Sequence, residues 1–416
     1  MTAASQASRR VTEARPRVLH VLTRIEGGPP LLVIPLCRQL NRLGYRTKFV
    51  TGTCEDLSLD MSYLLTPGDS VEWIPEMSRS VSVRNDFVAL WRLYRLMRAE
   101  KPVIVQTHTA KAGVLGRIAA LLAGIPVVIH TFHGHALNGY FHPRVGLAIR
   151  FAERILAKFS DAILVLSPHQ EHDLVERFHV APRLKVHIIP PGLDLERFQK
   201  LAPPTGRQGW LTVGWAGRFV PIKDIALLIE VMRETIRANA RVRFIVAGDG
   251  PERAKMEEAA RGWPDERVEW LGWTRDIEGF ISRCDVLIQT SRNEGTPISL
   301  IQGMAAGRPF VSTQAGGVVD MVTGITVREP AGGEWFDNAV LVEPDAPTFA
   351  SVLCQMQRDR RRLDLMGREA AVFAAASYSL EMLSRNYDRL YGGFLGHDVR
   401  EVATAVVDRA SDNVRA

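Results

Sequence analysis

Short runs of apolar and β-branched residues alternate with longer amphipathic stretches in the first half of the chain. The short runs are RVLHVLT, RTKFVT, VIVQTH, PVVIHT and AILVLS, and the longer stretches include 31–43, 111–123 and 145–159. Strand-length runs that alternate with helix-length stretches predict a parallel sheet covered by helices on both faces. The first half is therefore expected to be a doubly wound α/β unit.

The pattern pauses after KVHIIP at a segment rich in proline and polar residues, 190–208, and then resumes. The second series contains the runs WLTVGWAG, VRFIVAG, VEWLG, DVLIQTS and PFVST, with helical stretches at 222–238, 251–261 and 298–306. The predicted fold class is α/β, with two Rossmann-like doubly wound halves facing each other across a cleft. Open sheets of this kind bind ligands at the carboxyl ends of their strands, so ligand-binding residues are expected in the loops there.

The same pattern predicts the domain boundaries. Apolar positions at helical spacing between Leu380 and Leu390 predict a terminal helix. We expect a flexible leader over 1–16, an N-terminal Rossmann-like domain over 17–195, a linker over 196–208, a C-terminal Rossmann-like domain over 209–375, a C-terminal helix over 376–395 that packs back on the N-terminal domain, and a loose tail over 396–416.

Composition and charge narrow the class of protein. The chain has 416 residues, of which 46% are hydrophobic and 24% charged, and this excludes a disordered or fibrous chain. The first 200 residues hold 26 Lys and Arg against 17 Asp and Glu, a net charge of +9, whereas the rest has a net charge of −3. This asymmetry fits an anionic partner or surface on one half, or ordinary variation of a solvated surface.

Cysteine spacing and the N-terminal residues indicate the compartment. The four cysteines form no CxxC pair, and the first sixteen residues lack the apolar core of an export signal. Reduced thiols in a cytoplasmic protein are therefore expected. The longest apolar stretch, 114–129, contains Arg117 and Pro126, so no membrane-spanning helix is expected.

The loop SRNEGTPISLIQGMAAGRP carries the densest set of candidate ligand-binding residues. Thr296 is expected to cap a helix whose first residue is Pro297, and the free N–H groups at such a helix start suit a diphosphate. The phosphate would repel Glu294, so this carboxylate is expected to accept hydrogen bonds from sugar hydroxyls. Gln302, one to two turns along the helix, has an amide that can donate to and accept from further hydroxyls.

Two cations follow the first strand of the second half, because AGRFVPIKD places Arg218 and Lys223 at the cleft. A guanidinium can grip phosphate oxygens in a bidentate manner, and a lysine adds a compact point charge. Together they would stabilise a departing diphosphate without a metal ion. Taken alone, an arginine and a lysine at this spacing are also typical of solvated surface, so that alternative stays open.

Two glycines follow the first strand of the first half, in RIEGGPP. Gly27 and Gly28 permit close approach of the backbone to a ligand. Neither this turn nor GDGPE at 248–252 has the full GxGxxG spacing, so a dinucleotide site is not expected. A purely structural role for either turn stays open.

Histidines gather in QTHTAKAG and IHTFHGHALNGYFHP. No HExxH motif, cysteine pair or supporting carboxylate accompanies them, so no metal site is expected. His133 lies between a buried strand and Gly134, and it is expected to point into the cleft and hydrogen-bond a polar ligand. His130 and His135 are expected to be structural.

Together these motifs resemble the retaining, nucleotide-sugar-dependent glycosyltransferases of family 4, also called group 1, which have the GT-B fold. The resemblance covers about 17–394, and it implies that 17–195 is the acceptor-side domain and that 209–375 is the nucleotide-sugar-binding domain. It is carried, in the family's order, by THTAKAGVLGRIAA, IHTFHGH, IIPPGLDLERF, AGRFVPIKD, VAGDGPE and NEGTPISLIQGMAAGRPFVST.

The resemblance implies a role for each candidate residue. Arg218 and Lys223 would bind the donor diphosphate, while Glu294 and His133 would contact the donor sugar from opposite walls, and these four are the predicted catalytic residues. The predicted donor-binding residues are Gly27, Gly28, Gly295, Thr296, Pro297, Ile298 and Gln302.

Two features depart from the family pattern. The family usually has a second glutamate eight residues after the first, and Gln302 occupies that position here. An amide can bond a ribose diol but lacks charge assistance, which is commonly worth about 1 kcal/mol. The stretch TVREPAGGEWFDNAVLVEP is also longer than the usual connection at that place.

The implied reaction transfers a sugar from a UDP- or GDP-linked donor to an acceptor hydroxyl with retained configuration, in cell-surface polysaccharide or glycolipid synthesis. No metal ion and no cofactor besides the donor substrate are expected. A nucleotide-sugar epimerase or hydrolase of the same architecture is the nearest alternative, and a basic nucleic-acid-binding protein or an inactive scaffold are alternatives from other classes. Because no recognition motif accompanies the basic charge, nucleic acid is not an expected partner.

The acceptor, a saccharide or a lipid-linked molecule, is expected to meet the basic N-terminal half. The helix expected at 86–100 carries Arg92, Arg95 and Arg98, and the helix at 145–159 carries Arg150, Arg154 and Lys158 at i, i+4 and i+8. With the aromatic residues Tyr140 and Phe141 nearby, this face would suit an anionic membrane surface, at the inner face of the cell membrane, or a lipid diphosphate. Solvated helix faces are the alternative.

Overall fold

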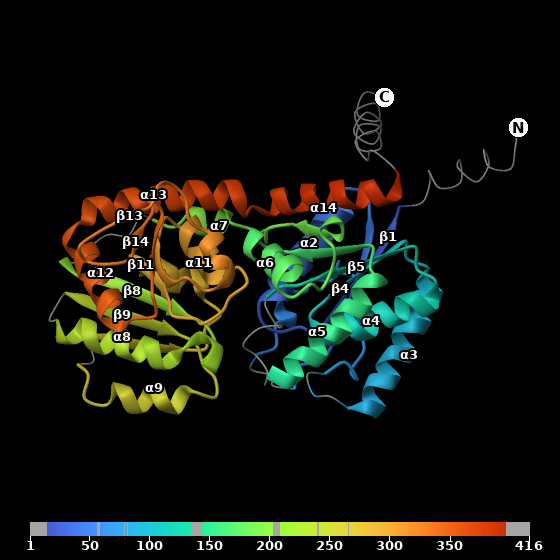
Figure 1. Ribbon diagram of the computed structural model, residues 1–416, viewed down its shortest axis with the longest axis horizontal. Helices are drawn as coiled ribbons and strands as arrows, with labels where there is room; N and C mark the ends of the chain where they lie inside the picture. Colours follow the sequence, from blue (N-terminus) through green and yellow to red (C-terminus); the bar gives the residue numbers. More distant parts are fainter. Residues whose placement is uncertain are drawn as a thin grey trace, which may run out of the picture.

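Two sheets, each covered by helices, lie side by side along the long axis of the molecule (Figure 1). The computed structural model describes residues 15–396 apart from 56–58, 79, 81, 135–142, 203–208, 239–240 and 265. The prediction of two doubly wound α/β halves is confirmed. The predicted leader up to residue 14 and the predicted tail from residue 397 lie outside the described residues, as do His135, Tyr140 and Phe141.

The N-terminal sheet has seven parallel strands in the order β3-β2-β1-β4-β5-β6-β7. The order reverses between β1 and β4, and such a switch point is where open α/β sheets bind ligands. The strands are β1 (Arg17–Arg24), β2 (Arg46–Gly52), β3 (Val71–Trp73), β4 (Ile104–His108), β5 (Val127–Thr131), β6 (Ala162–Val165) and β7 (Val186–Ile188). The helices include α2 (Gly28–Arg42), α3 (Val83–Glu100), α4 (Ala110–Ala123), α5 (Pro143–Lys158) and α6 (Pro168–His172).

The C-terminal sheet has eight strands in the order β10-β9-β8-β11-β12-β15-β14-β13. Its switch point lies between β8 and β11, which pair directly. The strands are β8 (Leu211–Ala216), β9 (Val242–Ala247), β10 (Val268–Gly272), β11 (Val286–Gln289), β12 (Phe310–Thr313), β13 (Val327–Arg328), β14 (Glu334–Trp335) and β15 (Ala339–Val342). The helices include α8 (Ile225–Arg237), α9 (Arg253–Ala260), α10 (Ile277–Ser282), α11 (Ile298–Ala305), α12 (Ala346–Arg358) and α13 (Arg360–Ser377).

One edge of the C-terminal sheet differs from the predicted parallel arrangement. The long stretch 326–344 forms β13, β14 and β15, and the β13–β14 and β14–β15 pairs are antiparallel. Trp335 on β14 is buried in the core, with the guanidinium of Arg362 4.3 Å from its ring centroid. The inserted stretch therefore extends the sheet and closes its core.

The segment expected to be a linker carries a short helix, α7 (Glu196–Gln199). Its Phe198 is fully buried and packs with the core that surrounds α11 and α13. The first part of the segment is therefore anchored on the C-terminal half by an aromatic side chain.

The chain passes between the halves twice, and the two crossings are hydrogen-bonded to each other. Leu193 N donates to Tyr378 O at 2.9 Å, and Leu380 N donates to Leu193 O at 3.0 Å. Gly192 lies so close to the second crossing that a Cβ there would be 2.4 Å from the Cβ of Leu383. The two crossings therefore lie side by side. They meet between the end of α13 and the start of the terminal helix, along the top of Figure 1.

The terminal helix α14 (Leu380–Leu395) lies against the N-terminal half. Gln106 Nε2 on β4 donates to the hydroxyl of Tyr387 at 3.0 Å, and the hydroxyl of Tyr391 donates to Gln106 Oε1. Tyr45 OH donates to Asp388 Oδ1 at 2.9 Å. Apolar packing and a buried polar network therefore fasten the last helix to a sheet that begins near residue 17.

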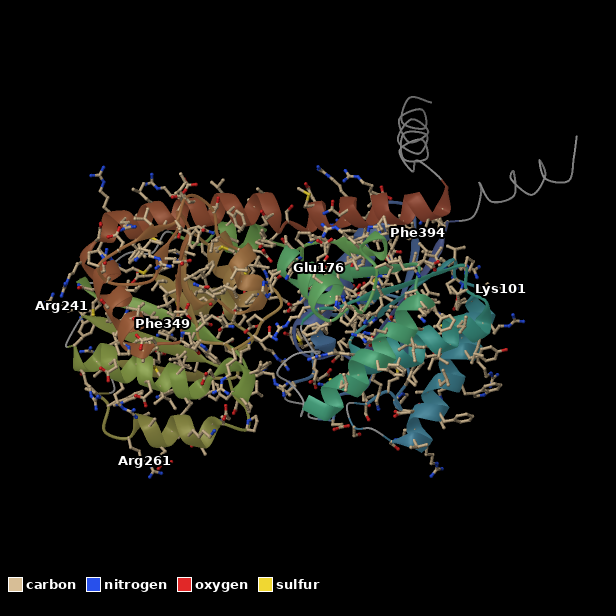
Figure 2. All side chains as sticks on the ribbon, in the orientation of Figure 1. Lys101, Glu176, Arg241, Arg261, Phe349 and Phe394 are labelled. Carbon is tan, nitrogen blue, oxygen red and sulfur yellow. The ribbon has the colours of Figure 1, made fainter. Side chains whose placement is uncertain are left out.

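We expect Tyr391→Ala to lower the free energy of unfolding of the N-terminal half by about 3–5 kcal/mol, because it removes a fully buried aromatic ring and leaves Gln106 without one partner. Urea unfolding followed by tryptophan fluorescence measures the change. Phe394→Ala is the matched control, since Phe394 lies on the same helix (Figure 2) and is 37% exposed. Equal midpoints for Tyr391→Ala and Phe394→Ala would contradict the bracing role of α14.

Candidate functional site

The carboxylate of Glu294 is the centre of a hydrogen-bonded cluster at the carboxyl edge of the C-terminal sheet. Its Oε1 accepts from Lys223 Nζ at 2.6 Å, from Gln289 Nε2 at 2.7 Å and from Ser291 Oγ. Lys223 follows β8 and Glu294 follows β11, so the pairing of these strands brings the two residues together. The cation predicted for the diphosphate and the carboxylate predicted for the sugar thus form one ion pair.

Arg218 reaches across to the other half of the chain. Its NH1 lies 3.7 Å from Oε1 of Glu26, and Arg24 pairs with the same oxygen. Glu26 is a cleft carboxylate that the sequence reasoning missed, because its only signal is its position before Gly27 in the loop after β1. This carboxylate therefore lies beside the arginine that is predicted to bind phosphate.

Two helix starts face each other across the cleft. Gly27 has a φ of 75° and precedes α2, whose first residue is Gly28. A Cβ on Gly28 would lie 3.1 Å from Cδ1 of Ile298, the first residue of α11. Pro29 and Pro30 have no N–H, so the start of α2 offers fewer donors than the start of α11.

Helix α11 begins at Ile298, where the predicted helical stretch begins, but its cap differs from the prediction. Pro297 is its N-cap with an extended ψ of 117°, and the predicted Thr296 cap is wrong. Thr296 Oγ1 is buried and has no hydrogen-bond partner within the described residues. Because Ile301 N donates to Pro297 O at 3.2 Å, the N–H groups before Ile301 in the first turn have no partner within the helix. Gln302 is buried farther along the same helix.

Gly295 brings the backbones of the two halves into contact. A Cβ at this position would lie 2.6 Å from His133 O and 3.1 Å from Gly134 Cα. On the other side, a Cβ on Gly317 would lie 2.2 Å from Gly295 O. The turn that follows Glu294 is therefore held between two backbones and accepts no larger residue.

His133 lies two residues past β5, beside Gly295. Its Nε2 is 2.8 Å from His108 Nδ1, while its Nδ1 is buried and has no hydrogen-bond partner within the described residues. His130, predicted to be structural, is buried with its Nδ1 2.8 Å from Thr107 Oγ1.

The histidines near the cleft bond to one another and to Thr107. Across the parts of the chain that the structure describes, no three His, Cys, Asp or Glu side chains are grouped so as to hold a metal ion. Burial lowers the pKa of His20 to about 3 and that of His133 to about 4. Burial, helped by the neighbouring histidines, also lowers the pKa of His108. All three imidazoles are therefore neutral at neutral pH.

The sequence matches two family models, one in each half. Residues 26–197 match the model described as Glycosyltransferase Family 4, and residues 211–359 match the model described as Glycosyl transferases group 1. The first match contains Gly27, Gly28 and His133, and the second contains Arg218, the Lys223–Glu294 pair and the start of α11.

Curated relatives have related descriptions. The chain is 30% identical over 312 residues to the Escherichia coli UDP-Gal:α-D-GlcNAc-diphosphoundecaprenol α-1,3-galactosyltransferase, covering 70% of this chain and 76% of the relative. It is 21% identical over 354 residues to the capsular polysaccharide biosynthesis glycosyltransferase CapM of Staphylococcus aureus, covering 82% of this chain and 89% of the relative.

A solved structure shares the fold. The structure of Anabaena Alr3699/HepE in complex with UDP and glucose superposes with a TM-score of 0.72, covering 90% of this chain and 99% of that chain. At 18% sequence identity, this likeness concerns the fold alone.

We expect the free energy of unfolding to fall as the pH drops from 6.5 toward 4. An unfolded histidine binds a proton near pH 6.5, whereas buried His20 and His133 stay neutral down to about pH 3 and 4, so the unfolded state takes up more protons in this window. Each such histidine costs about 1.4 kcal/mol per pH unit.

The measurement is urea unfolding at about pH 7 and pH 5, on the wild type and on His20→Asn, which removes one of these groups. Between pH 7 and pH 5, the free energy of unfolding should fall less in His20→Asn than in the wild type. The difference is the proton uptake of one unfolded histidine, which the variant lacks. An identical pH dependence in both proteins would contradict a buried, neutral His20.

Proposed function

We propose a reaction from the premise that the chain belongs to the family 4, group 1 glycosyltransferases, which have the GT-B fold. In this reaction, the protein transfers a hexose from a UDP-linked donor to a hydroxyl of a saccharide acceptor, and the configuration at the transferred sugar is retained. The single observation that carries the proposal is the meeting of the Lys223–Glu294 pair, the start of α11 and His133 at one point between the halves.

Arg218 and Lys223 are assigned to the donor diphosphate. Each cation lies beside a carboxylate, Arg218 beside Glu26 and Lys223 beside Glu294, and these pairs position the two side chains in the cleft. A diphosphate at the first turn of α11 would draw on the N–H groups there and on these two cations. This set stabilises the charge that develops on the leaving group, which is the largest contribution expected in such a transfer.

Glu294 and His133 are assigned to the hydroxyls of the donor sugar, and Gln302 to the ribose. Glu294 Oε1 is fixed by three donors, so the carboxylate is held without freedom to rotate. The description of the Escherichia coli relative names UDP-Gal, which supports uracil as the base. No metal ion is assigned a role in this scheme.

Retention of configuration is explained if the acceptor hydroxyl attacks the donor sugar on the same face from which the diphosphate leaves. The alternative, a covalent intermediate, needs a carboxylate nucleophile on the far face of the sugar. Glu26 is the cleft carboxylate from the N-terminal half, and its Oε1 is paired with Arg24 and close to Arg218, which makes it a poor nucleophile. The departing phosphate then accepts the proton of the acceptor hydroxyl.

We expect Arg218→Ala and Lys223→Ala each to lower turnover by about two or more orders of magnitude, because each removes charge from the departing diphosphate. The measurement is acceptor-dependent release of UDP from UDP-glucose or UDP-galactose. Lys255→Ala is the matched control, since Lys255 is an exposed residue of α9 paired with Glu252. Near-normal turnover in both cleft variants with intact folding would refute the assignment.

The same assay separates the rival functions. An epimerase or hydrolase would convert the UDP-sugar without acceptor, to an epimer or a free sugar seen by NMR. A nucleic-acid-binding protein would give a salt-sensitive gel shift, and an inactive scaffold would bind UDP in a thermal-shift screen without turnover. GDP-sugars included in that screen decide the base.

We further propose that the acceptor is lipid-linked and that the N-terminal half rests on an anionic membrane while it reacts. Helix α5 carries a line of exposed apolar side chains four residues apart: Leu147, Phe151, Ile155 and Phe159, just past its end, are 42–64% exposed. On α3, Val83, Phe87 and Trp91 repeat this spacing. Apolar lines of this kind on a charged helix are typical of residence at a membrane surface.

The basic row predicted on α5 is arranged differently from the prediction, because two of its three members contact Phe178. The guanidinium of Arg150 lies 4.3 Å from the ring centroid of Phe178, and Arg154 NH2 donates to Phe178 O at 2.7 Å. Lys158 is exposed, and the acidic Glu153 is buried against Arg117. The apolar line would therefore enter the membrane, with the basic side chains beside it.

No helix of the described residues is long and apolar enough to cross a bilayer. Attachment at the inner face of the cell membrane is therefore proposed to occur through this surface. The acceptor named for the Escherichia coli relative is linked to diphosphoundecaprenol, which supports a lipid-linked acceptor.

We expect the protein to float with vesicles containing phosphatidylglycerol and not with neutral phosphatidylcholine vesicles. The double variant Phe151→Ser and Ile155→Ser should reduce flotation by at least tenfold, because burying each of these side chains in the membrane is worth about 1.5–3 kcal/mol. Ile325→Ser is the control, since Ile325 is 85% exposed on the C-terminal half. Failure to bind either vesicle, or equal binding by the double variant, would remove the membrane proposal.

A further inference from the structure

Three histidines form a continuous line from the interior of the N-terminal sheet to the cleft. His20 lies on β1, His108 ends β4 and His133 follows β5, so the line crosses the switch point of the sheet. His20 Nδ1 is 3.2 Å from His108 Nε2, and His108 Nδ1 is 2.8 Å from His133 Nε2. The successive ring centroids are 5.4 and 5.0 Å apart.

Both ends of the line are open. His20 Nε2 and His133 Nδ1 are buried nitrogens with no hydrogen-bond partner within the described residues. A buried polar atom left unpaired costs about 1–3 kcal/mol, so such atoms in a native protein need an explanation. At the cleft end, a ligand in the proposed sugar site would supply the missing partner.

The number of protons allows two arrangements. Burial keeps all three rings neutral, so each ring has one N–H. Each of the two hydrogen bonds needs one proton between its nitrogens. If the proton of His108 is on Nδ1, then His20 and His133 also have theirs on Nδ1. If the proton of His108 is on Nε2, then His20 and His133 also have theirs on Nε2. Any combination of Nδ1 and Nε2 protons among the three rings breaks one of the two hydrogen bonds.

The two arrangements differ in what they leave unpaired. With every proton on Nδ1, His133 Nδ1 donates into the cleft and His20 Nε2 is a bare lone pair in the core. With every proton on Nε2, His20 holds a buried N–H that has no acceptor among the described residues. Orphaned buried N–H groups are rarer in native structures than under-satisfied acceptors. The first arrangement, which leaves no buried N–H of His20 without an acceptor, is therefore favoured.

We propose that His108 and His20 are positioning residues that fix His133 as a hydrogen-bond donor, through Nδ1, to an oxygen of the donor sugar. This inference rests on the proposed function, in which the sugar lies between Glu294 and His133. His20 never touches the ligand. It acts through His108. Because His20 donates its Nδ1 proton to His108 Nε2, His108 keeps its own proton on Nδ1 and donates it to His133 Nε2, so the proton of His133 stays on Nδ1.

NMR of the protein labelled with ¹⁵N-histidine tests the line directly, because protonated and bare ring nitrogens have different shifts. Single His→Gln variants assign the signals. In the free protein, the three rings should share one tautomer. With the UDP-sugar that gives the largest thermal shift, all three should be protonated on Nδ1. A mixed set, or protonation on Nε2 in the complex, would overturn the proposal.

Kinetics supply a second readout. His108→Phe removes both hydrogen bonds of the middle ring, and it should raise the donor KM about five- to tenfold with kcat changed less than twofold. His108→Gln has an amide that can accept from His20 and donate to His133, and it should restore most of the donor KM. An unchanged donor KM in His108→Phe would overturn the positioning role.

The two proposals fail differently. Sugar transfer by a protein whose three rings have mixed tautomers would overturn the histidine line and leave the glycosyltransferase assignment standing. A common tautomer in a protein that transfers sugar to no acceptor would support the line and overturn the proposed reaction.

Discussion

The contact between Gly295 and the backbone at His133 is the constraint on which the arrangement of the two halves depends. Because a Cβ at Gly295 would be 2.6 Å from the His133 carbonyl oxygen, the halves reach this distance only with glycine there. The contact brings the Glu294 turn and the start of α11 beside the loop after β5. Without this contact, the candidate residues at the ends of the two sheets would not lie together in one site.

Charge is arranged in the cleft so that Arg218 and Lys223 each lie beside a carboxylate. Lys223 is held by Glu294, and Arg218 lies between its own loop and Glu26 of the opposite half. Under the proposed function, a diphosphate would carry more charge than either carboxylate and would also reach the N–H groups of α11, so it would be the stronger partner. Glu26 would then orient the guanidinium of Arg218 across the cleft.

Sequence patterns predicted the features that are local or repeated. The alternation of strands and helices predicted two doubly wound halves, and motif order identified the family. The Thr296 cap was predicted wrongly because Pro297, which was expected to be the first helical residue, adopts an extended ψ and is itself the N-cap. The antiparallel strands at the sheet edge were missed because their runs are only two residues long.

Other features depend on pairs that are far apart in the chain. Tyr391 and Gln106 are 285 positions apart, and His20 and His108 are 88 apart, so only the strand order and the path of α14 bring them together. Glu26 belongs to no motif, and its place opposite Arg218 follows from how the two sheets face each other. Long-range polar pairs of this kind have no periodic signal in the sequence.

The paired crossings at Leu193 and Leu380 also determine how the molecule can move. Two crossings at separate places would resist rotation of one half against the other. Here the two crossings are hydrogen-bonded to each other at one place, so they form a single axis. A small turn about that axis displaces distant atoms more than nearby ones. A rotation about that axis would change the width of the cleft and leave the hydrogen bonds of both sheets and the anchorage of α14 unbroken.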